Sequence, residues 1–194
     1  MKVPITILIR ISFLCALYAC KSDKEIRPEW FAQGWGEVSA IYNGGAWSNI
    51  GSAALSPNVL PGSSCQGSLT VQIFKFSRDG YAREILQFSG IPKKQNGNYT
   101  LTSNALLGCS SDSVSATFNT FQDDGDVGKS TYKLDISQPL KLQIISYSSN
   151  DQRIVGNFEA TFIKGSQFKN DDPAVIKIEA GKFDSPISIK GRFE

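Results

Sequence analysis

The sequence predicts a single all-β domain, built either as an antiparallel β-sandwich or as a partly open β-barrel. From residue 37 onward, short runs rich in Val, Ile, Thr, Phe and Tyr alternate with Gly, Asn, Asp, Ser and Pro. The turn signals recur roughly every 8–12 residues, which is typical of sandwiches and barrels. No window of this region repeats its apolar residues with the helical period of about 3.6. The length of 194 residues suits one domain.

The first long strand signal lies at residues 66–76, where apolar and polar side chains alternate until the pattern changes face after Ile73. That change predicts a β-bulge near Ile73 and Phe74. An Asp-Gly pair follows at 79–80, and Asp-Gly is a strong signal for a hairpin turn. Residues 81–88 are therefore expected to return beside the first strand.

Later segments show the same short alternation, and turn residues separate most of them. Gly181 is expected to end the last of these strands, with a few apolar residues beyond it. An early strand is also expected at residues 41–47. The six later predicted strands are residues 99–102, 113–121, 130–136, 140–148, 153–163 and 174–180.

The first 19 residues predict a lipoprotein signal peptide. The apolar stretch at residues 11–19 is too short to span a bilayer, which needs about 20 apolar residues. It ends in Leu17-Tyr18-Ala19-Cys20, which resembles a bacterial lipobox. The resemblance implies cleavage before Cys20 and acylation of this residue, which palmitate labelling would detect. The alternative is an ordinary secretory signal cleaved near Ala19, and either signal exports the chain.

Residues 20–36 are interpreted as the lipidated cysteine and a polar tether, which leaves residues 37–194 for the β domain. Lys21 stands where an Asp would resemble an inner-membrane retention signal, so the outer membrane is favoured. Lys21, Asp23 and Glu25 loosely resemble the surface-export signal of some Bacteroidota lipoproteins. The sequence leaves open whether the domain faces the periplasm or the outside.

Charge and histidine content exclude several functions. Loss of Lys2 and Arg10 with the signal peptide reduces the basic residues from 20 to 18, which equals the 18 acidic residues. A net charge of zero gives no general electrostatic basis for binding nucleic acid. Because the chain contains no histidine, it has no Ser-His-Asp triad, no Cys-His dyad and no histidine-bound metal.

A pair of carboxylates could hydrolyse a glycosidic bond without histidine. Of the 18 acidic residues, Glu84 and Glu159 have the most apolar neighbours in the sequence, although Glu159 is expected to point into solvent. We therefore keep a glycan hydrolase as the alternative function. No residue is assigned a catalytic role, and no cofactor is expected.

Two cysteines remain after the signal peptide and the anchor. Cys65 and Cys109 form an even pair in an oxidising compartment, which predicts a disulfide. The chain has no C-x-x-C motif, and neither thiol has a marked basic neighbour that would make it reactive.

Two kinds of side chain are candidates for ligand binding. Trp30 and Trp35 are possible ligand-facing aromatics, because exposed rings stack on sugars. The alternative is that they cover a sheet edge, and Trp47 is expected to plug one end of the core.

Asp123, Asp124 and Asp126 form a weak candidate site for Ca²⁺, which prefers oxygen ligands. A solvated hairpin turn explains these residues equally simply. The pair at 171–172 is expected to be a solvated acidic turn for the same reason, and no metal is assigned.

Three segments resemble a known family. They are IYNGGAW at 41–47, IVGNFEA at 154–160 and IKIEAGKF at 176–183. Behind a lipobox and a short tether, this order resembles uncharacterised Bacteroidota lipoproteins built as β-rich domains. Their pattern is an N-G-x-x-W-like start, a G-x-F strand and a closing I-x-x-G-x-F, and one extra glycine stands between Asn43 and Trp47 here. The resemblance implies a β-rich envelope protein and brings no established activity.

The sequence thus predicts a lipid-anchored envelope protein with a non-enzymatic binding or structural β domain. Its expected partners are the membrane, through the anchor, and a glycan or an envelope protein, with no nucleic acid. A purely structural component that binds no small ligand is a further alternative.

Overall fold

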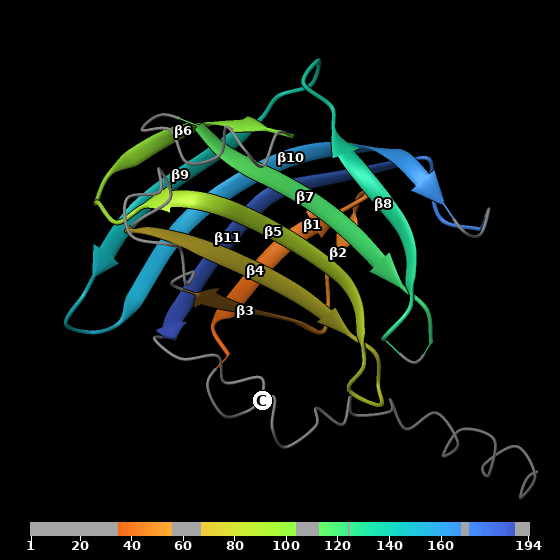
Figure 1. The fold of residues 1–194 in the computed structure, drawn as a ribbon, viewed down its shortest axis with the longest axis horizontal. Helices are drawn as coiled ribbons and strands as arrows, with labels where there is room; N and C mark the ends of the chain where they lie inside the picture. Colours follow the sequence, from red (N-terminus) through yellow and green to blue (C-terminus); the bar gives the residue numbers. More distant parts are fainter. Residues whose placement is uncertain (1–34, 56–66, 104–112, 124, 168–170, 189–194) are drawn as a thin grey trace, which may run out of the picture.

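The computed structural model describes residues 35–55, 67–103, 113–123, 125–167 and 171–188. In these residues, eleven strands form one sheet in the order β2-β1-β11-β3-β4-β5-β7-β6-β9-β10-β8 (Figure 1). The all-β prediction is confirmed. The strands are β1 (Glu37–Tyr42), β2 (Gly45–Ala46), β3 (Ile50–Leu55), β4 (Ser68–Phe76), β5 (Ala82–Pro92), β6 (Gly97–Thr102), β7 (Ser113–Phe121), β8 (Gly128–Leu134), β9 (Lys141–Ser148), β10 (Arg153–Gln167) and β11 (Val175–Ser188).

The sheet is mostly antiparallel, as expected, but it contains two parallel pairings and is therefore mixed. β6 runs parallel to β7, and β11 runs parallel to β3. The second contact joins strands from opposite ends of the chain, and it consists of two residue pairs, Ile187 with Ala54 and Ser188 with Leu55. β11 also pairs with β10. The strand pairings that run from β11 through β3 and the following strands to β10 therefore lead back to β11.

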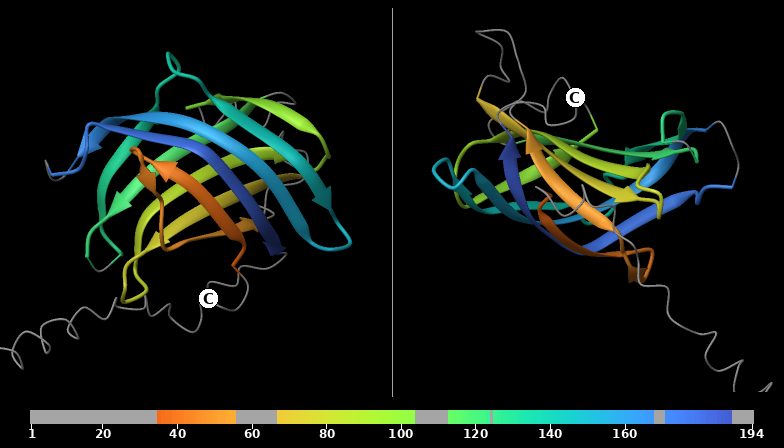
Figure 2. Two further views of the ribbon diagram at one scale, coloured as in Figure 1. Left: turned by 180° about the vertical axis from the view of Figure 1, so that it is seen from behind. Right: turned by 90° about the horizontal axis from the view of Figure 1, so that it is seen from below.

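The sheet curves into two facing layers. Figure 1 shows β4, β5, β7 and β8 in front of β9, β10, β11 and β1, and Figure 2 shows the same layers from behind and from below. Aromatic rings meet between the layers, because Phe88 of β5 lies 5.4 Å from Phe158 of β10, centroid to centroid. Phe118 of β7 likewise lies 5.7 Å from Phe162 of β10. The core therefore fills the space between the layers.

Period-two alternation explains which side chains enter this core. In β8, Ser130, Tyr132 and Leu134 are buried, while the residues between them are exposed. Alternate residues of a strand point to opposite faces, so one face of β8 supplies the core. The buried apolar residues of the core include Leu69, Val71, Ile73, Leu86, Phe88, Val114, Ala116, Phe118, Leu142, Ile144, Ile154, Phe158, Phe162, Ile176, Ile178 and Phe183.

The irregularity expected near Ile73 and Phe74 does not lie at these two residues. These residues pair in regular register with Leu86 and Ile85, and the register shifts of β4 lie at Leu69/Thr70 and Lys75/Phe76. Phe74 points away from the core, which is what plain alternation after Ile73 requires. The sequence pattern misled because an outer aromatic side chain resembles a core residue.

The segment 41–47 is a hairpin rather than one strand. Asn43 and Gly44 form its two-residue turn, with φ angles of 48° and 83°. Positive φ at both positions is the requirement of a type I′ turn, which Asn-Gly meets best.

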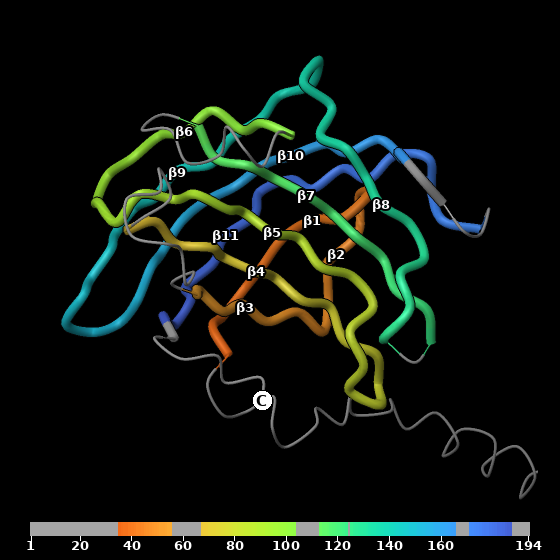
Figure 3. Tube along the Cα trace, viewed as in Figure 1, coloured from red at the N-terminus to blue at the C-terminus, as the bar shows by residue number. Residues whose placement is uncertain are grey.

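Gly181 does not end the last predicted strand. β11 continues to Ser188, and the Cα trace follows it beside β10 (Figure 3). Between the pairs Phe158–Gly181 and Ala160–Ile178, β11 contains one more residue than β10. Ala180, with a φ of 49°, lies at this bulge. The strand absorbs the irregularity as a bulge and keeps its pairing.

Candidate functional site

Several residues singled out in the sequence lie outside the described part of the structure. They are Cys20, Cys65, Cys109, Trp30 and Asp124. The signal peptide, the lipid anchor, the disulfide and one of the two tryptophans thus stay predictions.

Trp35 lies against the outer side of β4. Its ring meets Phe74 and Phe76 edge-on, at centroid distances of 5.0 and 5.2 Å. The two phenylalanine rings stack on each other at 5.7 Å. Trp35 therefore packs on apolar rings of the sheet, and these contacts occupy part of its surface.

Trp47 is buried, with 4% of its surface exposed, and it reaches a carboxylate inside the sheet. Its Nε1 donates a hydrogen bond of 2.8 Å to Oε2 of Glu84. The other carboxylate oxygen of Glu84 lies 3.1 Å from Nζ of Lys75. The Trp47 ring stacks on Tyr42 at 5.7 Å. Glu84 is thus held on both oxygens by groups from the sheet.

Glu84 belongs to a row of polar side chains that crosses four strands. Lys75 pairs with Glu84, Glu84 with Thr120, and Thr120 with Ser130. Each of these residues lies two positions along its strand from a buried core residue, so all four share the core face. The row marks the level at which the interior changes from apolar to polar.

Asp172 closes this polar end, and the expectation of a fully solvated turn is wrong for it. Its side chain is only 9% exposed, whereas that of Asp171 is 67% exposed. Oδ2 of Asp172 accepts hydrogen bonds from the hydroxyls of Thr120 at 2.7 Å and Ser130 at 2.6 Å, and Oδ1 lies 2.6 Å from Nζ of Lys129. These donors come from β7 and β8, so the residue ties a distant loop to the sheet.

Electrostatics in this cluster favour an ionised Asp172 and neutral phenols. Burial alone would raise the pKa of Asp172, but hydrogen bonds from Lys129, Ser130 and Thr120 hold the pKa below its ordinary value. Burial, together with the charges of Asp172 and Glu84, raises the pKa of Tyr132 to about 12. Burial and the charge of Glu84 also raise the pKa of Tyr42.

The acidic turn that was a weak calcium candidate is organised by its backbone and by arginine. Asp123 is fully exposed and lies 3.3 Å from the guanidinium of Arg83. The backbone N–H of Gln122 donates to the carbonyl of Val127, and that of Gly125 to the carbonyl of Gln122. In the described residues, no three cysteine or acidic side chains gather where they could bind a metal.

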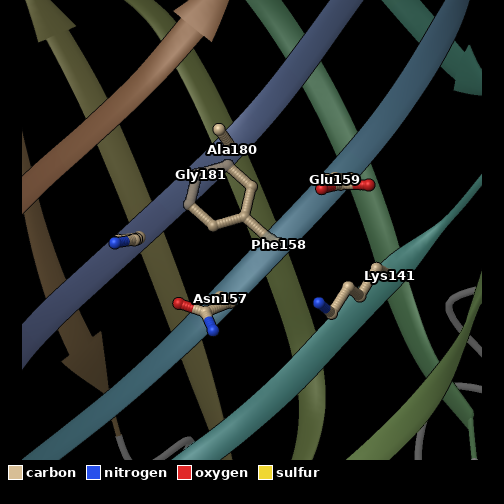
Figure 4. A pocket seen from close by; sticks show the side chains of 7 residues that line it. Lys141, Asn157, Phe158, Glu159, Ala180 and Gly181 are labelled. Atoms are coloured by element: carbon tan, nitrogen blue, oxygen red, sulfur yellow. The ribbon is translucent and has the colours of Figure 1, made fainter.

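A shallow hollow opens on the outer face of β9, β10 and β11 (Figure 4). It encloses about 160 Å³. Buried residues Phe158 and Gly181 form its floor. Its rim consists of Lys141 from β9, Asn157 and Glu159 from β10, and Ala180 and Lys182 from β11.

The backbone of β11 creates the hollow. Gly181 has no side chain, and a Cβ at this position would lie 2.6 Å from the ring of Phe158. The neighbouring bulge at Ala180 displaces the strand from regular register. On the core face the Phe158 ring covers Gly181, so the open space on the outer face comes from the bulge, which interrupts the regular row of outward side chains there.

Three charged side chains of the rim have no hydrogen-bond or ion-pair partner in the described part of the chain. Lys141, Glu159 and Lys182 make no side-chain hydrogen bond or ion pair there. Lys141 and Glu159 lie directly opposite each other on neighbouring strands, where opposite charges commonly pair. Asn157 makes one long contact of 3.5 Å, to the amide oxygen of Gln143.

Comparisons of the chain with protein families, with curated proteins and with solved structures found no match. The described part of the chain contains no helix with the length and hydrophobicity needed to cross a bilayer.

Sequence reasoning missed most of this hollow. It noted Glu159 only as a solvated carboxylate and did not consider Lys141, Asn157 or Lys182. The available signal was the Ala-Gly pair at 180–181 inside a strand pattern, since a glycine in a strand often marks a bulge or a close backbone approach.

Proposed function

We propose that this chain is a lipid-anchored protein of the cell envelope whose β domain binds a ligand on its outer face and performs no covalent chemistry. The supporting observation is the hollow on β9, β10 and β11, where three charged side chains are unpaired within the described structure. Charged groups that lack a protein partner are available to a ligand. The expected ligand is a glycan or an envelope protein.

The charged groups inside the sheet support a structural role for the polar end. Glu84 is bonded to Trp47 and Lys75, and Asp172 is bonded to Lys129 and two hydroxyls. Partly buried charges that are paired in this way have their hydrogen-bonding needs met within the protein, and removal of one partner would leave the other charge uncompensated. The interior cluster thus needs no ligand to explain it.

A carboxylate-based glycan hydrolase is the alternative. A general acid in such an enzyme must keep its proton near neutral pH, which requires a raised pKa. The pKa of Asp172 is lowered by its hydrogen bonds. Asp172 is therefore unsuited to the role of general acid, and the unpaired charged side chains of the hollow lead us to favour binding over hydrolysis.

The test combines location with binding. Cells are fractionated, and the mature lipidated chain is purified in detergent and applied to an array of capsular and envelope polysaccharides and to immobilised envelope proteins. We expect recovery in the outer-membrane fraction and saturable binding to one of these ligand classes. Release of new reducing ends from a bound glycan would instead support the hydrolase, and absence of all binding would contradict the proposal.

A further inference from the structure

We propose that the hollow between β9, β10 and β11 binds one hexuronic-acid residue of an acidic glycan. This inference rests on the proposed binding function and narrows its ligand class. It starts from the composition of the rim, which offers two lysines, one carboxylate and one amide around a floor of buried backbone.

The two lysines supply the attraction for a carboxylate. Lys141 on β9 and Lys182 on β11 lie on either side of β10 and are offset by two residues along it, so their backbones are about 12 Å apart, given about 4.8 Å between neighbouring strands and about 3.3 Å per residue. Long, flexible lysine side chains from both sides can reach a ligand above β10. Neither ammonium group forms a hydrogen bond or an ion pair with another residue of the described chain.

The carboxylate of Glu159 limits where an anionic group can lie. Glu159 is opposite Lys141 on β9, and Lys182 is opposite Asn157, two residues along β10. A compact anion centred above β10, such as phosphate, would meet the like charge of Glu159, whereas a ligand with its anionic group at one edge can direct that group toward a lysine and its uncharged part toward Glu159. The same carboxylate accepts hydrogen bonds from hydroxyl groups, and the amide of Asn157 can both donate and accept. The ligand must therefore carry a negative group and several hydroxyls on one small frame, which describes a hexuronic acid.

The size of the hollow sets the number of sugar units. About 160 Å³ is well below the roughly 300 Å³ at which pockets for drug-sized ligands begin. One sugar ring is thus the largest unit that the hollow encloses, and the neighbouring units of a chain would extend along the exposed sheet.

The backbone of the site is fixed by strand pairing before the ligand arrives. Its rim residues stand on strands that pair on both sides, with β10 between β9 and β11. Side chains mounted on paired strands are positioned more accurately than side chains on loops. Ala180 is also held at a φ of 49°, a backbone conformation that costs free energy for a residue with a Cβ and is found preferentially at functional positions.

The experiment titrates the mature chain with tri-galacturonate and with a neutral galactose trisaccharide of the same linkage, using calorimetry in detergent micelles. We expect the acidic trisaccharide to bind at least roughly tenfold more tightly, because the neutral sugar leaves the lysines unpaired. Binding should weaken as salt rises. Inorganic phosphate and free glutamate should not compete.

Variants locate the site. Lys141→Ala and Lys182→Ala should each weaken tri-galacturonate binding by roughly fivefold or more, as expected for a charge-assisted contact. Glu159→Gln should retain tri-galacturonate binding and allow phosphate to compete. Lys177→Ala is the matched control, because this residue lies on the same strand but pairs with Glu179 outside the rim, and it should leave the affinity unchanged.

Each contrary result has one meaning. Equal affinity for the neutral trisaccharide, or competition by phosphate or glutamate against the unsubstituted chain, overturns the hexuronic-acid assignment. Unchanged affinity in both lysine variants overturns the location. Capture of an envelope protein with no glycan binding overturns this inference but leaves the proposed function standing, whereas absence of any ligand removes both.

Discussion

At the level of single residues, two glycines and two phenylalanines form a reciprocal contact between β10 and β11. Gly156 pairs with Phe183, and Phe158 pairs with Gly181. A Cβ on Gly156 would lie 2.6 Å from the Phe183 ring, and one on Gly181 would lie 2.6 Å from the Phe158 ring. Each phenylalanine thus covers the glycine opposite, which explains why both strands contain Gly-x-Phe.

Replacement of Gly181 by alanine should destabilise the fold. The added methyl group would force the buried Phe158 ring or the backbone to move, which costs about 1–3 kcal/mol in a well-packed core. The measurement is urea unfolding of the mature chain. Gly128→Ala is the matched control, since nothing lies within 4 Å of a Cβ there and its φ is ordinary. A change in stability as small as that of the control would show that the contact between Gly181 and the Phe158 ring is not tightly packed.

Asp172 should make stability depend on acid. Its pKa is lower in the folded chain than in the unfolded chain, so its stabilisation is complete above the unfolded pKa of about 3.9. It is lost as the pH falls through the folded value. Asp172→Asn should cost about 1–3 kcal/mol at neutral pH and should remove this part of the acid sensitivity. Unfolding midpoints measured from pH 7 down to pH 2 test both effects.

Asp171→Asn is the control for that series. This neighbour also approaches Lys129, at 3.2 Å, but its side chain is 67% exposed. Exposed ion pairs contribute little, so we expect a change within roughly 0.5 kcal/mol. Equal losses for the two variants would assign the effect to Lys129 and not to the buried hydrogen bonds of Asp172.

At the level of elements, the β1–β2 hairpin is fixed to β11 by its turn residue. The backbone N–H of Asn43 donates to the carbonyl of Lys177 at 2.9 Å, and Oδ1 of Asn43 accepts from the backbone N–H of Lys177 at 2.7 Å. The side chain thereby continues the pairing of β1 with β11 after the strand has turned away. This hairpin also places Trp47 in the core.

Asn43→Ala should weaken this attachment by about 1–2 kcal/mol, because alanine is disfavoured at a φ of 48° and the side-chain hydrogen bond is lost. Asn43→Gly separates the two causes, since glycine keeps the backbone conformation and loses only the hydrogen bond. Indole fluorescence, to which the buried Trp47 contributes, follows the loss during urea unfolding. Equal stability of the alanine and glycine variants would show that the positive φ is not under strain.

Strand alternation predicted most elements from the sequence, and the failures have physical causes. The strands at 113–121 and 130–136 were recognisable because large inward residues alternate with small or polar outward ones. β3 escaped notice because Ile50–Leu55 consists mostly of small residues and is buried on both faces, so it shows no alternation. The continuation of β11 past Gly181 depends on Phe158, which is far away in the sequence.

The candidate site was less predictable than the fold. Nothing near Lys141 in the sequence indicates that β9 lies beside β10 at the level of Glu159. The burial of Asp172 likewise depends on hydroxyls of β7 and β8. Properties set by pairing between distant strands leave little local signal, whereas turn chemistry and alternation are local.

For the whole molecule, the first prediction concerns attachment to the membrane. We expect Cys20→Ser to release the protein from the membrane fraction, because a serine hydroxyl cannot form the thioether to diacylglycerol. Metabolic labelling with palmitate and fractionation measure this directly. Lys21→Ser is a suitable control, since it changes the tether and keeps the thiol. Unchanged labelling of the serine variant at position 20 would remove the anchor from the proposed function.

The second prediction at this scale is the disulfide between Cys65 and Cys109. The chain enters β4 at Ser68 and β7 at Ser113, and both strands pair with β5 in antiparallel fashion, so the two entrances lie at the same end of the sheet with only β5 between them. Closing a loop of about 45 residues would stabilise the fold by roughly 4 kcal/mol in the chain-entropy model. A thiol count on denatured, unreduced mature protein should find neither cysteine free. Two free thiols would show that the bond does not form.

The contact between β3 and β11 determines the order in which the molecule can be assembled. Ile187 meets Ala54 across 133 positions of sequence, whereas β10 and β11 are neighbours in the chain and can pair early. Contacts of such long range carry a large loop-closure cost, and sheets that depend on them fold on a time scale of roughly milliseconds to seconds. When the chain is synthesised or exported from its amino terminus, β11 cannot pair with β3 until residues 187 and 188 have become available. Until β11 pairs with it, β3 has one unpaired edge. The newly made chain is therefore most prone to aggregate just before β11 is complete.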